Sequence, residues 1–221
     1  TITSSQFNTL CLWGLTVRIN SNLAKLAAVA LSVTYTGLAH AELNVFACEP
    51  EYAALAKELA PTASIYSATT ALQDPHQVQA RPSLIAKMRQ ADLVVCAGAD
   101  LEVGWLPMLQ MKSANANVRS TDQGLFFAAD QIETLDKLAS VDRSMGDVHA
   151  QGNPHIHFDP TRLLKVATAL SAKLTQLDPA GAADYQKSLA DFTTRWQAAV
   201  PRWEEQAKGL QGKKVIAYHS S

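Results

Sequence analysis

Short apolar runs recur in the first part of the chain, each followed by a polar or amphipathic segment. Runs of this length, bounded by turn-forming residues, are typical of buried strands. The sequence predicts strands at 43–48, 64–67 and 92–96, and a weaker one at 117–119.

Amphipathic segments separate these runs. They predict helices over 52–59, 82–90 and 101–109, with Pro61 ending the first. The repeated strand–helix order indicates an α/β lobe with a parallel sheet and helices on both of its faces. Parallel sheets bind ligands beyond the carboxyl ends of their strands, so the loop that carries His76, after the second strand, should emerge at that edge.

The second half of the chain has a different pattern. Residues 126–138 fall in a less regular region and are expected to form a short helix, and Asp159 and Pro160 then begin a strong one. Aromatic and apolar residues in 180–208 predict a further helix that Pro201 should kink or weaken. That helix would span about 40 Å, enough to bridge two lobes.

The sequence then predicts a strand over 213–218, ending at His219. A strand that begins a second α/β unit needs neighbours to bury its faces, and these would have to follow Ser221. We therefore expect most of a second lobe to be missing. The expected parts are upstream residues with a signal peptide (1–41), an N-terminal α/β lobe (42–177), a long inter-lobe helix (178–210) and the first strand of a truncated C-terminal lobe (211–221).

The N-terminal region has the pattern of a secretory signal peptide. Arg18 and Lys25 precede an apolar run over 26–38, and Ala41 ends a cleavage site of small residues. A membrane-spanning helix needs about 20 apolar residues, and this run is shorter. We expect a mature protein that begins at Glu42 in the periplasm.

The composition is that of an ordinary globular protein. The chain has 221 residues, of which 48% are hydrophobic and 18% charged, and its formal net charge is -1. This near-neutral balance gives no electrostatic reason to expect nucleic acid or an anionic membrane as the partner. Cys48 and Cys96 each end an expected strand, so they form either a disulfide, if the strands are neighbours, or two buried free thiols.

Five histidines of the expected mature chain lie in loops or at the ends of expected elements: His76, His149, His155, His157 and His219. Neutral imidazole is the commonest nitrogen ligand for zinc, so this pattern is compatible with a metal site. The sequence has no helical zinc-protease motif, nucleophilic serine elbow or glycine-rich phosphate loop. The residues alone thus indicate a secreted α/β protein whose histidines are either metal ligands or solvated groups.

Four short motifs, in order, resemble those of the zinc- and manganese-specific solute-binding proteins of bacterial ABC importers. Asp-Pro-His at 74–76 and Asn-Pro-His at 153–155 resemble the first two ligand segments of that family, and Tyr-His-Ser at 218–220 resembles the third. Ala-Asp-Leu-Glu-Val-Gly-Trp-Leu-Pro at 99–107 is similar to the signature that follows the family's third strand. The resemblance covers about residues 42–221.

The resemblance implies a metal-capturing protein and not an enzyme. Its ligands would be His76, His155 and His219, each giving one imidazole nitrogen, and a carboxylate beyond Ser221 would be the fourth. Three imidazoles and a carboxylate suit tetrahedral Zn²⁺. Manganese-selective members have a carboxylate in place of the third histidine, so Mn²⁺ is the less favoured cargo. The partner would be the membrane permease of an ABC importer, and we expect a monomer.

Two histidines depart from the commoner family pattern. His157 stands where many members have tryptophan, and His149 lies in a loop before the second ligand. One hypothesis is that His149 helps to capture or hand over metal. The alternative, which the sequence favours, is that both residues are solvated or hydrogen-bond to the ligands. Asp74 could orient His76, and Asp159 is expected to cap the helix that follows it.

Other functions remain open on the sequence. A secreted zinc hydrolase would need Glu49 or Glu102 as its general base. A metal-binding adhesin or chaperone on the same fold cannot be separated from a transport component. In the preferred interpretation, Glu102 and Trp105 pack in the core or between lobes, and Trp196 and Trp203 are packing residues of the long helix.

Overall fold

Four short strands form one parallel sheet in the computed structural model, which describes residues 42–142, 145, 148–214 and 216. The strands are β1 (Asn44–Ala47), β2 (Ser64–Ser67), β3 (Leu93–Cys96) and β4 (Leu125–Phe127), in the order β2-β1-β3-β4. Each neighbouring pair is parallel. The predicted parallel sheet is therefore confirmed, and the carboxyl ends of its strands lie at one edge.

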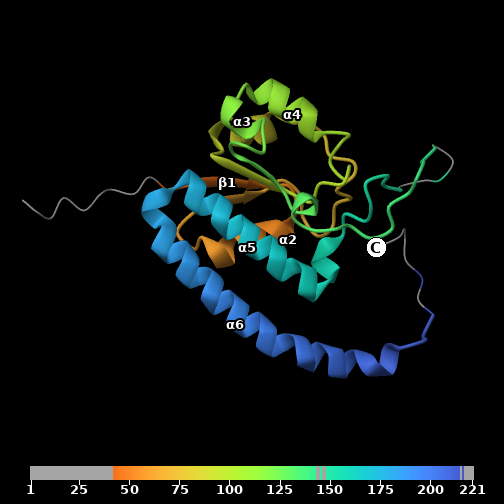
Figure 1. Cartoon of the computed structure of the whole chain (residues 1–221). Coiled ribbons are helices and arrows are strands. Elements are labelled where there is room, and N and C mark those ends of the chain that lie inside the picture. The colour runs from red at the N-terminus through yellow and green to blue at the C-terminus, as the bar shows by residue number, and fades with distance from the viewer. Residues whose placement is uncertain (1–41, 143–144, 146–147, 215, 217–221) are drawn as a thin grey trace, which may run out of the picture. The chain divides into compact units, whose positions relative to one another are not determined.

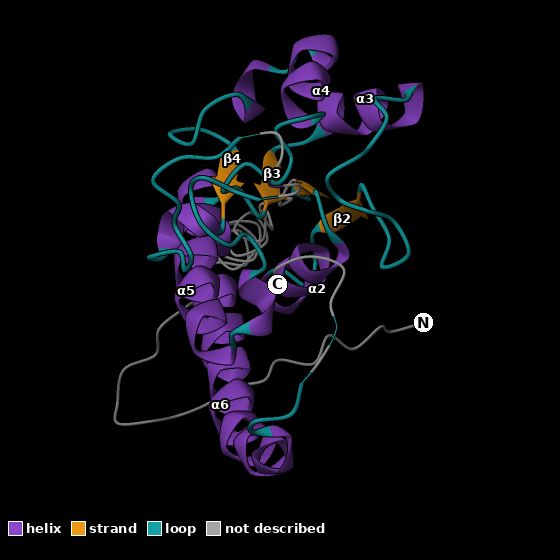
Figure 2. Cartoon of the chain, turned by 90° about the vertical axis from the view of Figure 1, so that its right-hand side faces the viewer, coloured by secondary structure: helices purple, strands orange, loops and turns teal. Residues whose placement is uncertain are grey.

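Helices cover both faces of this sheet (Figure 1, Figure 2). The pair α3 (Pro82–Gln90) and α4 (Leu106–Ser113) covers one face. On the other face lie α2 (Pro50–Leu59) and α5 (Pro160–Leu177), against which α6 (Ala182–Ala207) packs. Short 3-10 turns occur at Ala116–Val118, Ala129–Gln131, Ile156–Phe158, Pro179–Gly181 and Lys208–Leu210. Within the described residues, no helix is both long and apolar enough for a membrane span.

Alternation along the two central strands explains the two layers of core packing. Val45 and Val95 pack with α2 and α5, whereas Phe46 and Val94 pack with α3 and α4, as the two-residue period of a strand requires. Each of these side chains is at most 2% exposed. Burying a side chain of this size contributes about 1.5–3 kcal/mol, so β1 and β3 are held firmly where their carboxyl ends meet the loops.

The capping of α5 by Asp159 is confirmed. Its Oδ1 accepts hydrogen bonds from the backbone N–H groups of Thr161 at 2.9 Å and Arg162 at 3.1 Å. On the neighbouring helix, Trp196 donates from Nε1 to the carbonyl oxygen of Pro160 at 2.7 Å. These contacts fix the start of α5, which directly follows the segment that carries His155 and His157.

The helix α6 continues through Pro201, although proline removes one backbone donor. Trp203 lies in this last part of the helix, 40% exposed, with its ring edge-on to Trp196 and the ring centroids 5.0 Å apart. All residues from 201 to 214 are exposed. The end of α6 therefore extends past the surface that it packs against.

The strand predicted over 117–119 is wrong. The side-chain oxygen of Asn115 accepts a hydrogen bond from the backbone N–H of Asn117 at 3.1 Å and begins a 3-10 turn. The same side chain donates to the carbonyl oxygens of Met88 and Ala91. A polar residue that satisfies three backbone groups in this way favours a turn over an extended strand.

The fourth strand is Leu125–Phe127, so the helix predicted over 126–138 is also wrong. Gly124 makes the pairing with β3 possible, because a Cβ at that position would lie 2.2 Å from the carbonyl oxygen of Asp92. Such a short apolar run does not reveal by itself whether it is a strand or a helix.

The helix predicted over 101–109 begins later, at Leu106. Gly98, Ala99 and Asp100 have φ values of 79°, 48° and 68°, so the chain leaves β3 through three left-handed residues. The turn that follows places the side chain of Glu102 back toward the end of β3 before the helix starts.

The strand predicted over 213–218 falls largely outside the described residues, and His219 lies outside them entirely. Lys213, Lys214 and Ile216 are described and do not belong to a strand.

Candidate metal centre

The loop between β2 and α3 presents His76 with its ring orientation fixed. The Oδ1 atom of Asp74 accepts from the backbone N–H of His76 at 2.9 Å and lies 2.7 Å from the ring Nδ1. A carboxylate can only accept there, so Nδ1 carries the proton and Nε2 of neutral His76 is an acceptor. This is the tautomer that binds a metal through Nε2. The suggestion that Asp74 orients His76 therefore agrees with the geometry.

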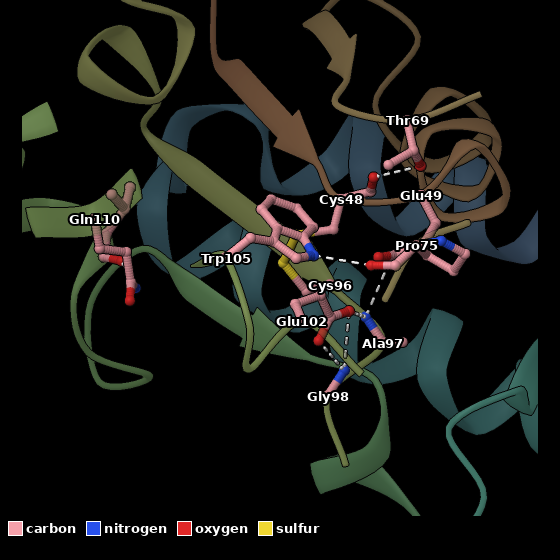
Figure 3. The surroundings of a disulfide bond; sticks show 11 residues. Cys48, Glu49, Thr69, Pro75, Cys96, Ala97, Gly98, Glu102, Trp105 and Gln110 are labelled. Carbon is pink, nitrogen blue, oxygen red and sulfur yellow. Dashed lines mark hydrogen bonds between the residues drawn. A yellow bond between two sulfur atoms is a disulfide. The ribbon is translucent and has the colours of Figure 1, made fainter. Parts of the chain in front are cut away.

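Trp105 anchors the same loop through a hydrogen bond to its backbone. Its Nε1–H donates to the carbonyl oxygen of Pro75 at 2.8 Å, and the side chain is 2% exposed (Figure 3). The backbone of Gly104 passes near the same loop, where an added Cβ would make only an ordinary contact, 3.5 Å from the carbonyl oxygen of His76. Sequence reasoning expected Trp105 to pack, and it does, but its role in anchoring the histidine loop was missed.

His155 approaches His76 from the segment that precedes α5. The side-chain oxygen of Asn153 accepts from the backbone N–H of His155 at 2.9 Å, and the backbone N–H of Asn153 donates to Leu135 at 2.8 Å. The rings of His76 and His155 have centroids 6.2 Å apart and are inclined at 61°. The Nε2 atom of His155 is buried. Two of the three predicted ligands thus face the same region although 79 positions separate them in the chain.

His149 is closer still to His76. The two Nε2 atoms are 3.2 Å apart, and the rings are stacked with centroids 5.2 Å apart and planes inclined at 24°. The structure therefore places this histidine, which the sequence singled out only as an auxiliary residue, directly against the first predicted ligand.

His157 is turned to a different partner. Its ring centroid is 6.0 Å from that of His155, but its Nδ1 lies 3.2 Å from Oε1 of Glu51 on α2. Burial lowers the pKa of His157, and the Glu51 carboxylate partly opposes that effect. A cavity of about 390 Å³ lies beside this pair and is also lined by Glu49, Pro75 and Leu101.

A disulfide joins Cys48 to Cys96 at the carboxyl ends of β1 and β3 (Figure 3), with the Cα atoms 4.8 Å apart. Of the two alternatives left open by the sequence, the structure therefore has the disulfide and not two free thiols. Both sulfur atoms lie near the carboxylate of Glu102. Among the described residues, Cys48, Cys96 and Glu102 form a group whose potential metal-ligand atoms all lie within 4.8 Å of one another. Sulfurs joined in a disulfide are not thiolates, so this cluster is not a metal site.

Two buried carboxyl groups lie beside the disulfide. Glu102 accepts from the backbone N–H of Ala97 at 2.7 Å and of Gly98 at 3.1 Å, and Glu49 accepts from the same Ala97 at 3.3 Å. Burial raises the pKa of Glu49 well above its ordinary value, and the neighbouring Glu102 raises it further. Burial also raises the pKa of Glu102, although its hydrogen bonds oppose this. Burial therefore favours the protonated form of Glu49, and the hydrogen bonds of the two carboxyl groups support the loop that follows β3.

These observations define a class of protein, in which a parallel α/β lobe gathers imidazole groups at the carboxyl edge of its sheet. Residues 45–221 match the family described as the periplasmic zinc-uptake complex component A, ZnuA. Because this match covers most of the chain, the protein belongs to that family. The resemblance noted in the sequence is thereby confirmed.

Relatives of known name are similar to much of the chain. The metal ABC transporter substrate-binding lipoprotein ScbA of Streptococcus cristatus is 23% identical over 192 residues, covering 86% of this chain and 60% of ScbA. The corresponding lipoprotein SloC of Streptococcus mutans serotype c is 24% identical over 123 residues, covering 56% of this chain and 38% of SloC. These relatives are substrate-binding proteins, not enzymes. The chain spans less than two thirds of the length of each.

Solved structures share the fold. A ZnuA crystal structure gives a TM-score of 0.66 at 22% identity, covering 81% of this chain and 64% of ZnuA. A zinc-bound deletion mutant of ZnuA gives 0.68 at 22% identity, covering 82% and 64%. A manganese-bound point mutant of a periplasmic metal-binding protein of Candidatus Liberibacter asiaticus gives 0.58 at 18% identity, covering 73% and 55%. These likenesses establish the ZnuA-type α/β fold of the lobe.

Proposed function

We propose that this protein captures zinc outside the cytoplasm and delivers it to the membrane permease of an ABC importer. The observation that carries the proposal is the pairing of His76, held in its metal-binding tautomer by Asp74, with His155 at the carboxyl edge of the sheet. His76 and His155 each supply one imidazole nitrogen. His219 supplies the third, and a carboxylate that follows Ser221 completes the set.

The donor set favours zinc over manganese. Three imidazole nitrogens and one carboxylate form the tetrahedral arrangement that Zn²⁺ adopts, whereas Mn²⁺ prefers oxygen-rich sites. A relative's structure is described as zinc-bound and another's as manganese-bound, so the histidine at 219 is what supports zinc for this chain. Ligation requires neutral imidazole, so zinc affinity should fall as the pH drops below about 6.5.

The protein binds and releases its cargo without chemical turnover. We assign 42–177 to a first lobe, 178–210 to a long helix that leads to a second lobe, and 211–221 to the start of that lobe. Ligands from both lobes then converge on one ion, and a continuous helix allows only modest movement between them. A signal peptide over 1–41 would bring a monomeric protein to the periplasm, where the permease receives the metal.

A zinc hydrolase is the less favoured alternative. Such an enzyme needs a general base within hydrogen-bond reach of a metal-bound water. Glu102 is 2% exposed and accepts hydrogen bonds from Ala97 and Gly98, and Glu49 is 1% exposed, with a pKa that burial raises well above its ordinary value. Neither carboxylate is therefore available as that base.

A zinc titration against a chromophoric chelator tests the proposal on the full gene product after removal of its leader. The wild type should take up one tight equivalent, and His219→Ala should bind it about tenfold more weakly or worse. His157→Gln is the matched control, because His157 pairs with Glu51 and should leave the affinity unchanged. Absence of a tight equivalent in the wild type would contradict the proposal.

A further inference from the structure

Two imidazole rings from distant parts of the chain meet with their Nε2 atoms 3.2 Å apart. One belongs to His76, whose Nδ1 is bound to Asp74, so that its Nε2 is an acceptor. The other belongs to His149, 73 positions later. Without metal, a neutral His149 can donate a hydrogen bond from its Nε2–H to Nε2 of His76, and this hydrogen bond is enough to explain the short contact.

The same separation also suits a shared cation. At zinc–nitrogen distances of about 2.0–2.1 Å, two ligands on one tetrahedral edge lie about 3.3–3.4 Å apart. An ion between the two Nε2 atoms would therefore require a shift of only a few tenths of an ångström and a change of the His149 tautomer. The two rings already converge on the region that a metal would occupy.

The turn that presents His149 is attached to the lobe. The backbone N–H of Gly152 donates to the carbonyl oxygen of His149 at 3.1 Å, and Thr134 donates from Oγ1 to Gln151 at 2.5 Å. Gln151 in turn donates to Asp100 at 3.2 Å. Gly152 has a φ of 100°, and a Cβ there would lie 2.5 Å from Oγ1 of Thr134, so glycine is required for this close approach. These hydrogen bonds and the close packing at Gly152 thus hold His149 beside His76.

We propose that His149 is a further metal ligand, which joins His76 and His155 to hold the ion from this lobe before His219 engages. This inference rests on the proposed zinc capture. In this proposal His149 binds the metal ion, whereas in the alternative its side chain is only solvated. His157 is not assigned such a role, because its Nδ1 faces Glu51.

The test measures Zn²⁺ affinity by chelator competition in the full gene product, comparing His219→Ala with His219→Ala/His149→Gln. Removing His219 isolates the binding that remains on this lobe. We expect His149→Gln to weaken that remaining affinity by about tenfold or more. His219→Ala/His157→Gln is the matched control and should equal His219→Ala. Cobalt(II) bound to the same variants gives a second readout, since loss of an imidazole should change its visible absorption.

The outcomes separate the two proposals. A tight site in the wild type, with equal affinities and cobalt spectra for His219→Ala and His219→Ala/His149→Gln, would overturn the role of His149 and leave zinc capture standing. A wild type without a tight site would overturn both. A loss caused by His157→Gln as large as that caused by His149→Gln would also overturn the assignment, because it would show that any histidine near the site matters equally.

Discussion

The indole N–H of Trp105 donates a 2.8 Å hydrogen bond to the carbonyl oxygen of Pro75, the residue directly before His76. A buried residue at the start of α4 thereby fixes the loop that presents a proposed ligand. The hydrogen bond links the packing of the α3–α4 side of the sheet to the position of one imidazole ring.

Trp105→Phe keeps an aromatic ring in the core and removes the donor. We expect the free energy of unfolding to fall by about 1 kcal/mol, because one buried hydrogen bond is lost, and zinc affinity to fall by about tenfold, because the loop is less well positioned. Urea unfolding and chelator competition measure these two effects. Trp203→Phe, at a 40% exposed position, is the control. An affinity equal to that of the wild type would mean that the bond supports the fold alone.

Asp74→Asn tests the orientation of His76. The amide oxygen can still accept from the backbone N–H of His76, so the turn should persist, but the charge that fixes the ring tautomer is lost. We expect zinc affinity to fall about 10- to 100-fold with little change in thermal stability. Chelator competition with a parallel melting curve separates these quantities, and an unaltered affinity would remove Asp74 from the site.

The carboxyl pair gives the protein a stability that depends on pH. Because the pKa of Glu49 is raised in the folded state, its favourable contribution is complete below the unfolded-state value of about 4.3 and is lost as the pH rises through the folded-state value. Glu49→Gln, which can donate to Glu102 at any pH, should therefore be more stable than the wild type by about 1–2 kcal/mol at pH 8, and the advantage should shrink toward pH 5.

Urea unfolding of metal-free protein across this pH range measures the difference. Glu205→Gln, at an exposed position on α6, should follow the wild type throughout. A constant difference between Glu49→Gln and the wild type from pH 5 to pH 8 would contradict the raised pKa of Glu49.

The disulfide should be a major source of stability. It closes a segment with a sequence separation of 48, for which loop closure alone predicts about 4 kcal/mol, and measured values are commonly about 2–4 kcal/mol. The double variant Cys48→Ala/Cys96→Ala should lose stability in this range, measured by urea unfolding under oxidising conditions. The wild type treated with a reductant is expected to approach the variant, and equal stability in all three samples would show that packing alone holds β1 and β3 together.

Local patterns predicted the elements that depend on local signals. The strands Ser64–Ser67 and Leu93–Cys96 and the helix cap at Asp159 follow from nearby residues. The fourth strand was missed because its pairing depends on Gly124. Only a residue without a Cβ fits there, because the backbone of Asp92, from elsewhere in the chain, comes so close. Sequence periodicity does not record such a contact.

The contacts of the site also fall into a short-range one, which the sequence predicted, and long-range ones, which it did not. The contact of Asp74 with His76 spans two positions and was anticipated from the motif. The bond from Trp105 to Pro75 spans 30 positions, and the contact of His149 with His76 spans 73. Neither long-range contact has a sequence signal of its own, because each arises where separate loops meet at the edge of the sheet.

The bond between Cys48 and Cys96 makes the rigidity of this lobe depend on the compartment in which the chain is found. Reducing compartments keep cysteine thiols reduced, so a newly made chain there would lack the cross-link between its two central strands. A precursor that has to be threaded through a membrane gains from being easy to unfold. The lobe would then become firmly folded, and its histidine loops steadily held, only after the chain had reached an oxidising environment.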